Sequence, residues 1–176
     1  MDAIIKKNAT NFGLISGVIA LLVTLMMYVI DLKLFVNMWI GFGLLIVWII
    51  IGVMLLSKCK KEKNGQLSFK EGFTAYFLSA LIGIAISTAF NILLFNFVDT
   101  EAKDIITEHL VDFQVGMLEK FDAPSADIQK AAESIRENSQ FSLKGQFFGF
   151  MQALLGAIIF GLILAAIMKS RKKEVY

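Results

Sequence analysis

The side chains that could carry catalytic or metal chemistry are few and far apart in this sequence. His109 is the single histidine and Cys59 the single cysteine among 176 residues. A zinc site needs several imidazole or thiolate ligands at short spacing, so we expect no metal site. The G-x-S-x-G, Walker A, G-x-G-x-x-G and H-E-x-x-H patterns are also missing from the sequence. We therefore predict no catalytic residue, no cofactor-binding residue and no cofactor, and a protein that is not an enzyme.

A stripe of acids is the most regular group of ionisable residues. Glu101, Asp104, Glu108 and Asp112 follow one another at intervals of three, four and four residues, which places them on one side of a helix. Such a stripe could collect divalent cations, but the sequence has no D-x-[DN]-x-[DN]-G loop to hold calcium. We expect a solvated polar face instead.

Four long apolar stretches form the framework that must position these residues. None has an ionised side chain in its interior, and about 20 apolar residues at a rise of about 1.5 Å each cross a bilayer core roughly 30 Å thick. Hydrophobic residues make up 57% of the chain, above the roughly 45–50% of soluble proteins. The sequence therefore predicts an all-α fold, an integral membrane four-helix bundle in a single membrane domain over residues 1–176. The expected spans are Phe12–Ile30, Phe35–Leu56, Phe73–Phe97 and Phe147–Met168.

The charges are divided between the connecting segments. Residues 99–142 carry ten acids and four bases, whereas the rest of the chain carries thirteen bases and five acids. Because lysine and arginine near span ends are retained in the cytoplasm, we expect both termini on the cytoplasmic side of a bacterial inner membrane. The basic segments are Lys6 and Lys7, the lysines between 58 and 70, and Lys169, Arg171, Lys172 and Lys173.

The acidic segment between spans three and four is expected to be an extracytoplasmic helical hairpin. Apolar residues recur with helical spacing in its first half, at Ile106, Leu110, Phe113, Met117 and Phe121. The run Asp122-Ala123-Pro124 should end this helix and start a second one, with the aspartate as its cap. The second helix should end near Asn138. Some forty residues bury little surface on their own, so the hairpin must pack on itself, the bundle, the membrane or a partner.

Two sequence signals describe the entry to span three. Asn64-Gly65 is a turn dipeptide in the lysine-rich connection. Ser68 and Glu71 have the spacing of a capping box just before an apolar run. We expect Ser68 to be the N-cap of the third helix.

Small residues recur along the spans and predict close contact between helices. In a bilayer, helices associate through van der Waals contact, and small side chains permit it. The contact could lie within one four-helix monomer or between copies in a homo-oligomer, and the sequence does not separate the two. The helix-packing candidates are Gly13, Gly17, Gly83, Gly149, Ala153, Ala157, Gly161 and Ala165.

Two amides lie inside spans at similar expected depth. Asn91 is near the outer end of span three and Gln152 near the outer end of span four. An unpaired amide in hydrocarbon is costly, so we expect an interhelical polar pair, with a substrate-binding polar spot as the alternative.

Several short motifs give the chain a family resemblance. They are Gly65-x-x-Ser68-Phe69-Lys70-Glu71-Gly72-Phe73, Val98-Asp99, Phe141-Ser142-Leu143 and Ala165-Ala166-Ile167-Met168-Lys169. In this order the chain resembles a family of four-span membrane proteins, common in Bacteroidetes, catalogued as a domain of unknown function (number four-one-nine-nine). The resemblance implies a bacterial inner-membrane location and no established activity, and it supplies no catalytic residues.

These observations favour a multi-pass inner-membrane protein of unknown activity, a non-enzymatic structural or interaction protein of the envelope. The alternative is a small transport or channel component acting as an oligomer, although ionisable residues and broken helices are missing from the spans. The expected partners are the lipid bilayer and, through residues 99–142, a second copy or an envelope protein. No nucleic acid is expected, because the lysines at 58–70 act first as a topology signal.

Overall fold

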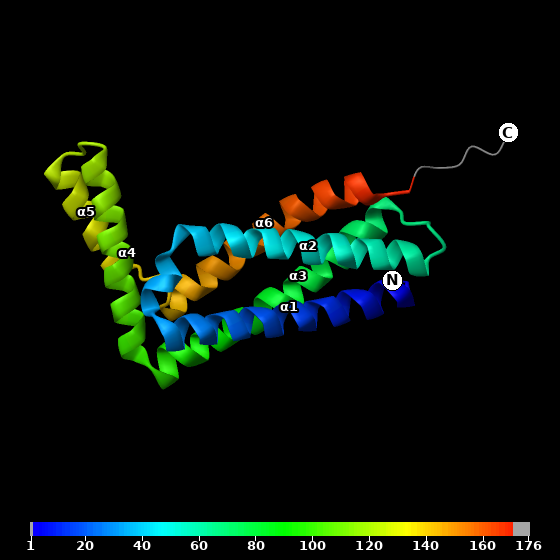
Figure 1. The fold of residues 1–176 in the computed structure, drawn as a ribbon, viewed down its shortest axis with the longest axis horizontal. Coiled ribbons are helices and arrows are strands. Elements are labelled where there is room, and N and C mark those ends of the chain that lie inside the picture. Colours follow the sequence, from blue (N-terminus) through cyan, green and yellow to red (C-terminus); the bar gives the residue numbers. More distant parts are fainter. Residues whose placement is uncertain (1, 171–176) are drawn as a thin grey trace. The chain divides into compact units, whose positions relative to one another are not determined.

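The computed structural model describes residues 2–170, which form six α-helices and two short helical turns (Figure 1). Three residues of the basic C-terminal segment, Arg171, Lys172 and Lys173, lie outside the described residues. The elements are α1 (Ala3–Ile30), η1 (Leu32–Val36), α2 (Met38–Glu62), α3 (Phe69–Leu93), η2 (Leu94–Val98), α4 (Thr100–Lys120), α5 (Ser125–Glu137) and α6 (Leu143–Met168).

Four of the described helices are long and apolar enough to cross a membrane. They are α1, α2, α3 together with η2, and α6. Few of their residues are buried inside the protein, as expected of helices whose remaining apolar surface faces lipid. The chain is therefore a multi-pass membrane protein, and the prediction of an all-α membrane helical bundle is confirmed.

Local sequence signals set the turn between α2 and α3. Asn64 and Gly65 have φ angles of +52° and +82°, a left-handed conformation that glycine and asparagine adopt most easily. Ser68 and Glu71 form the predicted capping box, in which the Ser68 N–H donates to Glu71 Oε2 at 2.9 Å and the Glu71 N–H donates to Ser68 Oγ at 3.3 Å. The prediction that Ser68 caps the third helix is confirmed.

The chain forms two compact units, each containing parts of the four long helices. Of the described residues, unit 1 comprises 2–20, 43–87 and 152–170, and unit 2 comprises 21–42 and 88–151. The core of unit 1 lies near the Lys-rich connection between α2 and α3. It is made of Ile5, Leu55, Leu56, Cys59, Leu67, Ala75 and Leu164.

Unit 2 contains the predicted helical hairpin, which is confirmed as α4 and α5. The two helices pack along each other (Figure 1), and α4 also contacts η1 and η2. Asp99 caps the start of α4, where its side chain accepts a hydrogen bond from the Ala102 N–H at 2.9 Å. The hairpin is thus continuous with the end of the third membrane helix.

The prediction that Asp122 caps the second helix of the hairpin is wrong. Asp122 has a φ of +53° and closes the end of α4, where its N–H donates to the Glu119 carbonyl at 3.0 Å. The N-cap of α5 is Pro124, which makes no side-chain cap bond. Its φ of −57° already suits the start of a helix, and its carbonyl accepts from the Ile128 N–H at 3.1 Å, so α5 begins without a side-chain cap.

Candidate functional site

An aromatic cluster in unit 2 joins the hairpin to the ends of the membrane helices. Phe35 of η1, Phe95 of η2 and Phe141, just before α6, meet edge to face, with ring centroids 4.9 to 5.8 Å apart. Ala102 and Ile106 of α4 are buried against the same cluster. Edge-to-face contacts add to the burial energy of such rings. The first two turns of α4 are therefore anchored in a core.

Polar contacts surround this aromatic cluster. The Tyr28 hydroxyl, at the end of α1, donates to Asp99 Oδ2 at 2.7 Å. This bond, and after it the bond from the Ala102 N–H, holds the pKa of Asp99 below its usual value. Asn96 Nδ2 donates to the Phe141 carbonyl at 3.0 Å. The start of α4 is therefore tied to α1, and η2 is tied to the entry of α6.

Two further contacts close the hairpin at its base. Thr107 Oγ1 and Ser139 Oγ lie 2.7 Å apart and are buried. Arg136 Nε and Nη2 donate to the two carboxylate oxygens of Glu108, both at 2.8 Å. The guanidinium hydrogen bond lowers the pKa of Glu108 and raises that of Arg136. The last turn of α5 is thereby held beside the middle of α4.

The predicted acid stripe lies on the exposed side of α4. Glu101, Asp104, Glu108 and Asp112 are exposed, and the buried residues of the helix are Ala102, Ile106, Thr107 and Val111. His109 is half-buried on the same helix. Among residues 2–170, no group of three histidine, cysteine, aspartate or glutamate side chains comes together as a metal site.

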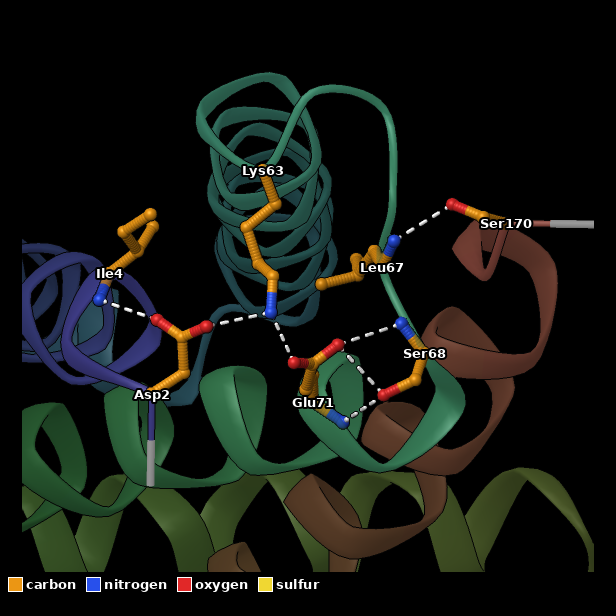
Figure 2. Close-up of polar contacts among 7 residues, drawn as sticks. All are labelled: Asp2, Ile4, Lys63, Leu67, Ser68, Glu71 and Ser170. Atoms are coloured by element: carbon orange, nitrogen blue, oxygen red, sulfur yellow. Dashed lines mark hydrogen bonds and ion pairs between the residues drawn. The ribbon is translucent and has the colours of Figure 1, made fainter.

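In unit 1, Lys63 joins two helix starts (Figure 2). Its Nζ donates to Asp2 Oδ2 at 2.7 Å and to the Glu71 carboxylate, and the other oxygen of Asp2 accepts from the Ile4 N–H at 2.8 Å. The bond to Lys63 lowers the pKa of Asp2, and the bond to Asp2, followed by that to Glu71, raises the pKa of Lys63. We call Asp2, Lys63 and Glu71 the lysine clamp.

The end of α6 is tied to the same connection. Ser170 Oγ accepts from the Leu67 N–H at 2.8 Å (Figure 2), and the Ser170 N–H donates to the Leu67 carbonyl at 2.8 Å. Lys60 Nζ donates to the Met168 carbonyl at 3.2 Å. The bond from Lys60 satisfies a carbonyl that the last turn of α6 would otherwise leave unpaired.

Also in unit 1, Asn8 is fully buried and its Nδ2 donates to Glu62 Oε2 at 2.7 Å. Its Oδ1 has no partner among the described residues. Cys59 is also fully buried, in the core of unit 1. Neither side chain is therefore placed to react from solution.

The predicted packing glycines of α1 and α3 lie where these two helices meet. A Cβ on Gly13 would come within 2.9 Å of the Ser79 carbonyl oxygen, and one on Gly17 within 2.7 Å of Ile86. A Cβ on Gly83 would lie 3.0 Å from the Cβ of Ser16. The contact is made inside one chain.

The small-residue ridge of α6 divides into two parts. Ala157, Gly161 and Ala165 are buried, and a Cβ on Gly161 would come within 2.8 Å of the Tyr76 ring. Gly149 and Ala153 are exposed, and a Cβ on Gly149 would meet nothing within 4 Å. A spacing of four residues turns by about 40° per step around a helix of 3.6 residues per turn. The two ends of the ridge therefore face different directions.

The two amides have different surroundings. Asn91 Oδ1 is buried and has no hydrogen-bond partner among the described residues. Gln152 is exposed on α6. Their interhelical pairing stays a prediction.

In a comparison with known families, residues 11–170 match the family described as "Protein of unknown function (DUF4199)". The chain belongs to this family. No curated protein and no solved structure matches it. The family match agrees with the resemblance found in the sequence motifs and, like that resemblance, brings no activity with it.

Sequence reasoning missed several contacts in this DUF4199 chain. Gly52 of α2 was outside the predicted ridges, yet a Cβ there would come within 2.6 Å of the Tyr76 ring. Asn8 and Thr107 each find partners more than thirty residues away, which spacing along one helix does not reveal. A local signal existed only for Asp99, which stands before a polar helix start as N-caps do.

Proposed function

We propose that this protein is a non-enzymatic inner-membrane protein of the bacterial envelope that presents its α4–α5 hairpin to a partner outside the cytoplasm. The observation that carries the proposal is the way the hairpin is held. Its first turns are buried with Phe95 and Phe141, whereas the acids of α4 remain exposed. A helix that is already anchored and has an exposed charged face suits recognition of a protein partner, because the helix loses little conformational entropy when the partner binds.

The arrangement of charges supports the orientation in this proposal. The lysine clamp and Lys60 belong to unit 1, and the acid-rich hairpin belongs to unit 2. Lysine near span ends favours the cytoplasmic side. With the Lys-rich connection between α2 and α3 in the cytoplasm, the one span that separates it from the hairpin would put the acid stripe in the periplasm.

The structural roles of the polar side chains support a non-enzymatic function. Asp99 caps a helix, Glu108 pairs with Arg136, and Lys63 bridges two carboxylates. Catalytic acids and bases are usually found with strongly perturbed pKa values in a cleft. Here the close polar pairs cap a helix or join one helix to another.

Photo-cross-linking in native membranes tests the proposal. A photoreactive residue at Asp104 or Asp112 should form a discrete adduct, either with a second copy or with another envelope protein. The same residue at Gln66, which is exposed in the connection between α2 and α3, serves as the control and should not give that adduct. Failure to form any protein adduct from either acidic position would contradict the proposal.

A second candidate function is a transport or channel component acting as an oligomer. The observation that favours it is Gln152, an exposed amide inside a membrane helix, in the same region of α6 as Gly149 and Gly156, where an added Cβ would meet nothing within 4 Å. An amide facing lipid gains from pairing with another helix. The mass of the protein–detergent complex separates the candidates, since a monomer would exclude the oligomeric pore.

A further inference from the structure

The apolar stripe of α4 extends beyond the part of the helix that the protein core covers. Ala102 and Ile106 are buried in the aromatic cluster. The same side of the helix continues through Leu110, Phe113 and Met117, at intervals of four, three and four residues after Ile106. Phe113 is 39% exposed, and Phe121, at the end of the helix, is 78% exposed. The stripe thus passes from a buried to an open position within one helix.

The other sides of α4 have different surroundings. Thr107 and Val111 form the remaining buried side, and Thr107 is bonded to Ser139 beyond the end of α5. The acids occupy the exposed side, where Asp104 keeps 77% of its side-chain surface accessible. The apolar stripe is therefore neither the acidic side nor the one that carries Thr107.

The position of α4 relative to the lipid follows from the residues beside it. Phe97 and Val98 end the third membrane helix and are 74% and 66% exposed, so they contact lipid in a bilayer. Asp99 is the only residue between them and α4. The helix therefore begins at the edge of the hydrocarbon, and the side carrying Ala102 and Ile106 faces the ends of the membrane helices.

From Ile106 to Lys120, α4 extends for about 20 Å at a rise of about 1.5 Å per residue. Its apolar stripe starts on the ends of the membrane helices, so its continuation faces the surrounding bilayer. Helices with an apolar side and a charged side lie in the interface in this way, with aromatic residues at the acyl boundary. The acids, on the other side, avoid the poorly solvating lipid.

We propose that α4 is an interfacial helix whose Phe113, Met117 and Phe121 lie in the headgroup region of the adjoining leaflet. The partner of this surface is the lipid of the protein's own membrane, and Lys120, beside Phe121, is placed to reach lipid phosphates. The inference holds for either orientation of the chain and with or without a protein partner on the acidic side.

Spin-label accessibility in nanodiscs tests this inference. The variants F113C and F121C each carry one nitroxide, in a full-length chain with C59A, in phosphatidylcholine nanodiscs. Both labels should be several-fold more accessible to oxygen, which concentrates in lipid, than to a water-soluble nickel complex. The matched control, E119C on the exposed side of the same helix, should show the reverse preference. V98C and S125C calibrate the lipid and water limits.

Two results would overturn the inference. Nickel accessibility of F121C and F113C equal to that of E119C would show that the stripe lies in water. Low accessibility to both reagents would show that protein covers it, and a dependence on the number of copies per disc would identify a second copy as the cover. M117C provides a third position on the stripe in case one phenylalanine variant does not fold, which circular dichroism would reveal.

Discussion

At Gly145 the backbone of α6 passes against the turn that leads into it. A Cβ at this position would lie 2.2 Å from the Ser139 carbonyl oxygen and 2.7 Å from the Cα of Gln140. Both are backbone atoms, which cannot rotate away as a side chain can. Ser139 itself is fixed by its contact with Thr107, so the turn has little freedom to yield.

Gly145→Ala should therefore destabilise unit 2 by about 1–3 kcal/mol, the usual cost of forcing extra atoms into a packed site. The matched control is Gly149→Ala, one turn further along α6, where a Cβ meets nothing within 4 Å. That change should be neutral or stabilising by up to about 1 kcal/mol, since alanine favours helix more than glycine does. Unfolding in mixed micelles measures both, and equal stability of the two variants would contradict the geometry of this turn.

The lysine clamp predicts a dependence of stability on pH. In the folded chain the pKa of Asp2 is lowered from its ordinary value of 3.8. The stabilisation that ionised Asp2 gives the folded chain is therefore present above the ordinary pKa, and it is lost as the pH falls through the folded pKa. The pKa of Lys63 is raised from its ordinary value of 10.5. The stabilisation that charged Lys63 gives the folded chain is therefore present below the ordinary pKa, and it is lost as the pH rises through the folded pKa.

Lys63→Met should weaken the pH dependence of stability at acid pH, because Asp2 loses the partner that lowers its pKa. It should weaken it at alkaline pH as well, because the titrating amine is removed. Lys61→Met, at an exposed position in the same connection, should leave the pH profile of the parent chain unchanged. The measurement is the midpoint of unfolding between pH 3 and 11 for the three chains. If the pH profile of Lys63→Met is identical to that of Lys61→Met, the lysine clamp does not form in the membrane-embedded protein.

Between elements, the buried pair of Thr107 and Ser139 connects α4 to the entry of α6. The Thr107 hydroxyl donates to the Lys103 carbonyl at 2.8 Å, so the Ser139 hydroxyl must donate to Thr107. Thr107→Val would leave the buried Ser139 hydroxyl without an acceptor, at a cost of about 1–3 kcal/mol. Ser139→Ala leaves Thr107 bonded to Lys103 and removes only a long acceptor of the Phe141 N–H, at 3.4 Å, so it should cost less.

A double-mutant cycle measures the coupling. The chain carrying both Thr107→Val and Ser139→Ala should lose less stability than the sum of the two single changes, because no unpaired hydroxyl remains. Strict additivity would mean that the two side chains do not interact.

Elements whose signals are local could be predicted from the sequence. The turn at Asn64-Gly65, the capping box of Ser68 and Glu71, and the α4–α5 hairpin depend on residues within a few positions of each other. The cap of α5 could not be predicted in this way, since aspartate and proline both suit a helix start and only the φ of Asp122 decides between them.

Contacts between elements far apart in the sequence could not be predicted from the sequence patterns. Asp2 and Lys63 are 61 positions apart, and nothing in their spacing brings them together. The spacing of four residues predicts the small-residue ridge of α6, but it does not tell which members face a neighbouring helix. Gly161 meets the Tyr76 ring, whereas Gly149 meets nothing within 4 Å.

For the whole molecule, the assignment of sides is the prediction on which the proposed function depends. The Lys-rich connection between α2 and α3 should be cytoplasmic and the hairpin external. Cys59 cannot report on this, because its side chain is fully buried in the core of unit 1 and would escape a thiol reagent from either side. Suitable reporters must be exposed, and Gln66 and Ser125 both are.

In a chain with Cys59→Ala, a cysteine at Ser125 should react with a membrane-impermeant thiol reagent in cells whose outer membrane has been made permeable. A cysteine at Gln66 should react only after the inner membrane is opened. Both residues lie outside the helices that cross the membrane, so the difference reports the side and not the burial of the thiol. Labelling of Gln66→Cys in cells with an intact inner membrane, with Ser125→Cys protected, would reverse the orientation and place the acid stripe of α4 in the cytoplasm.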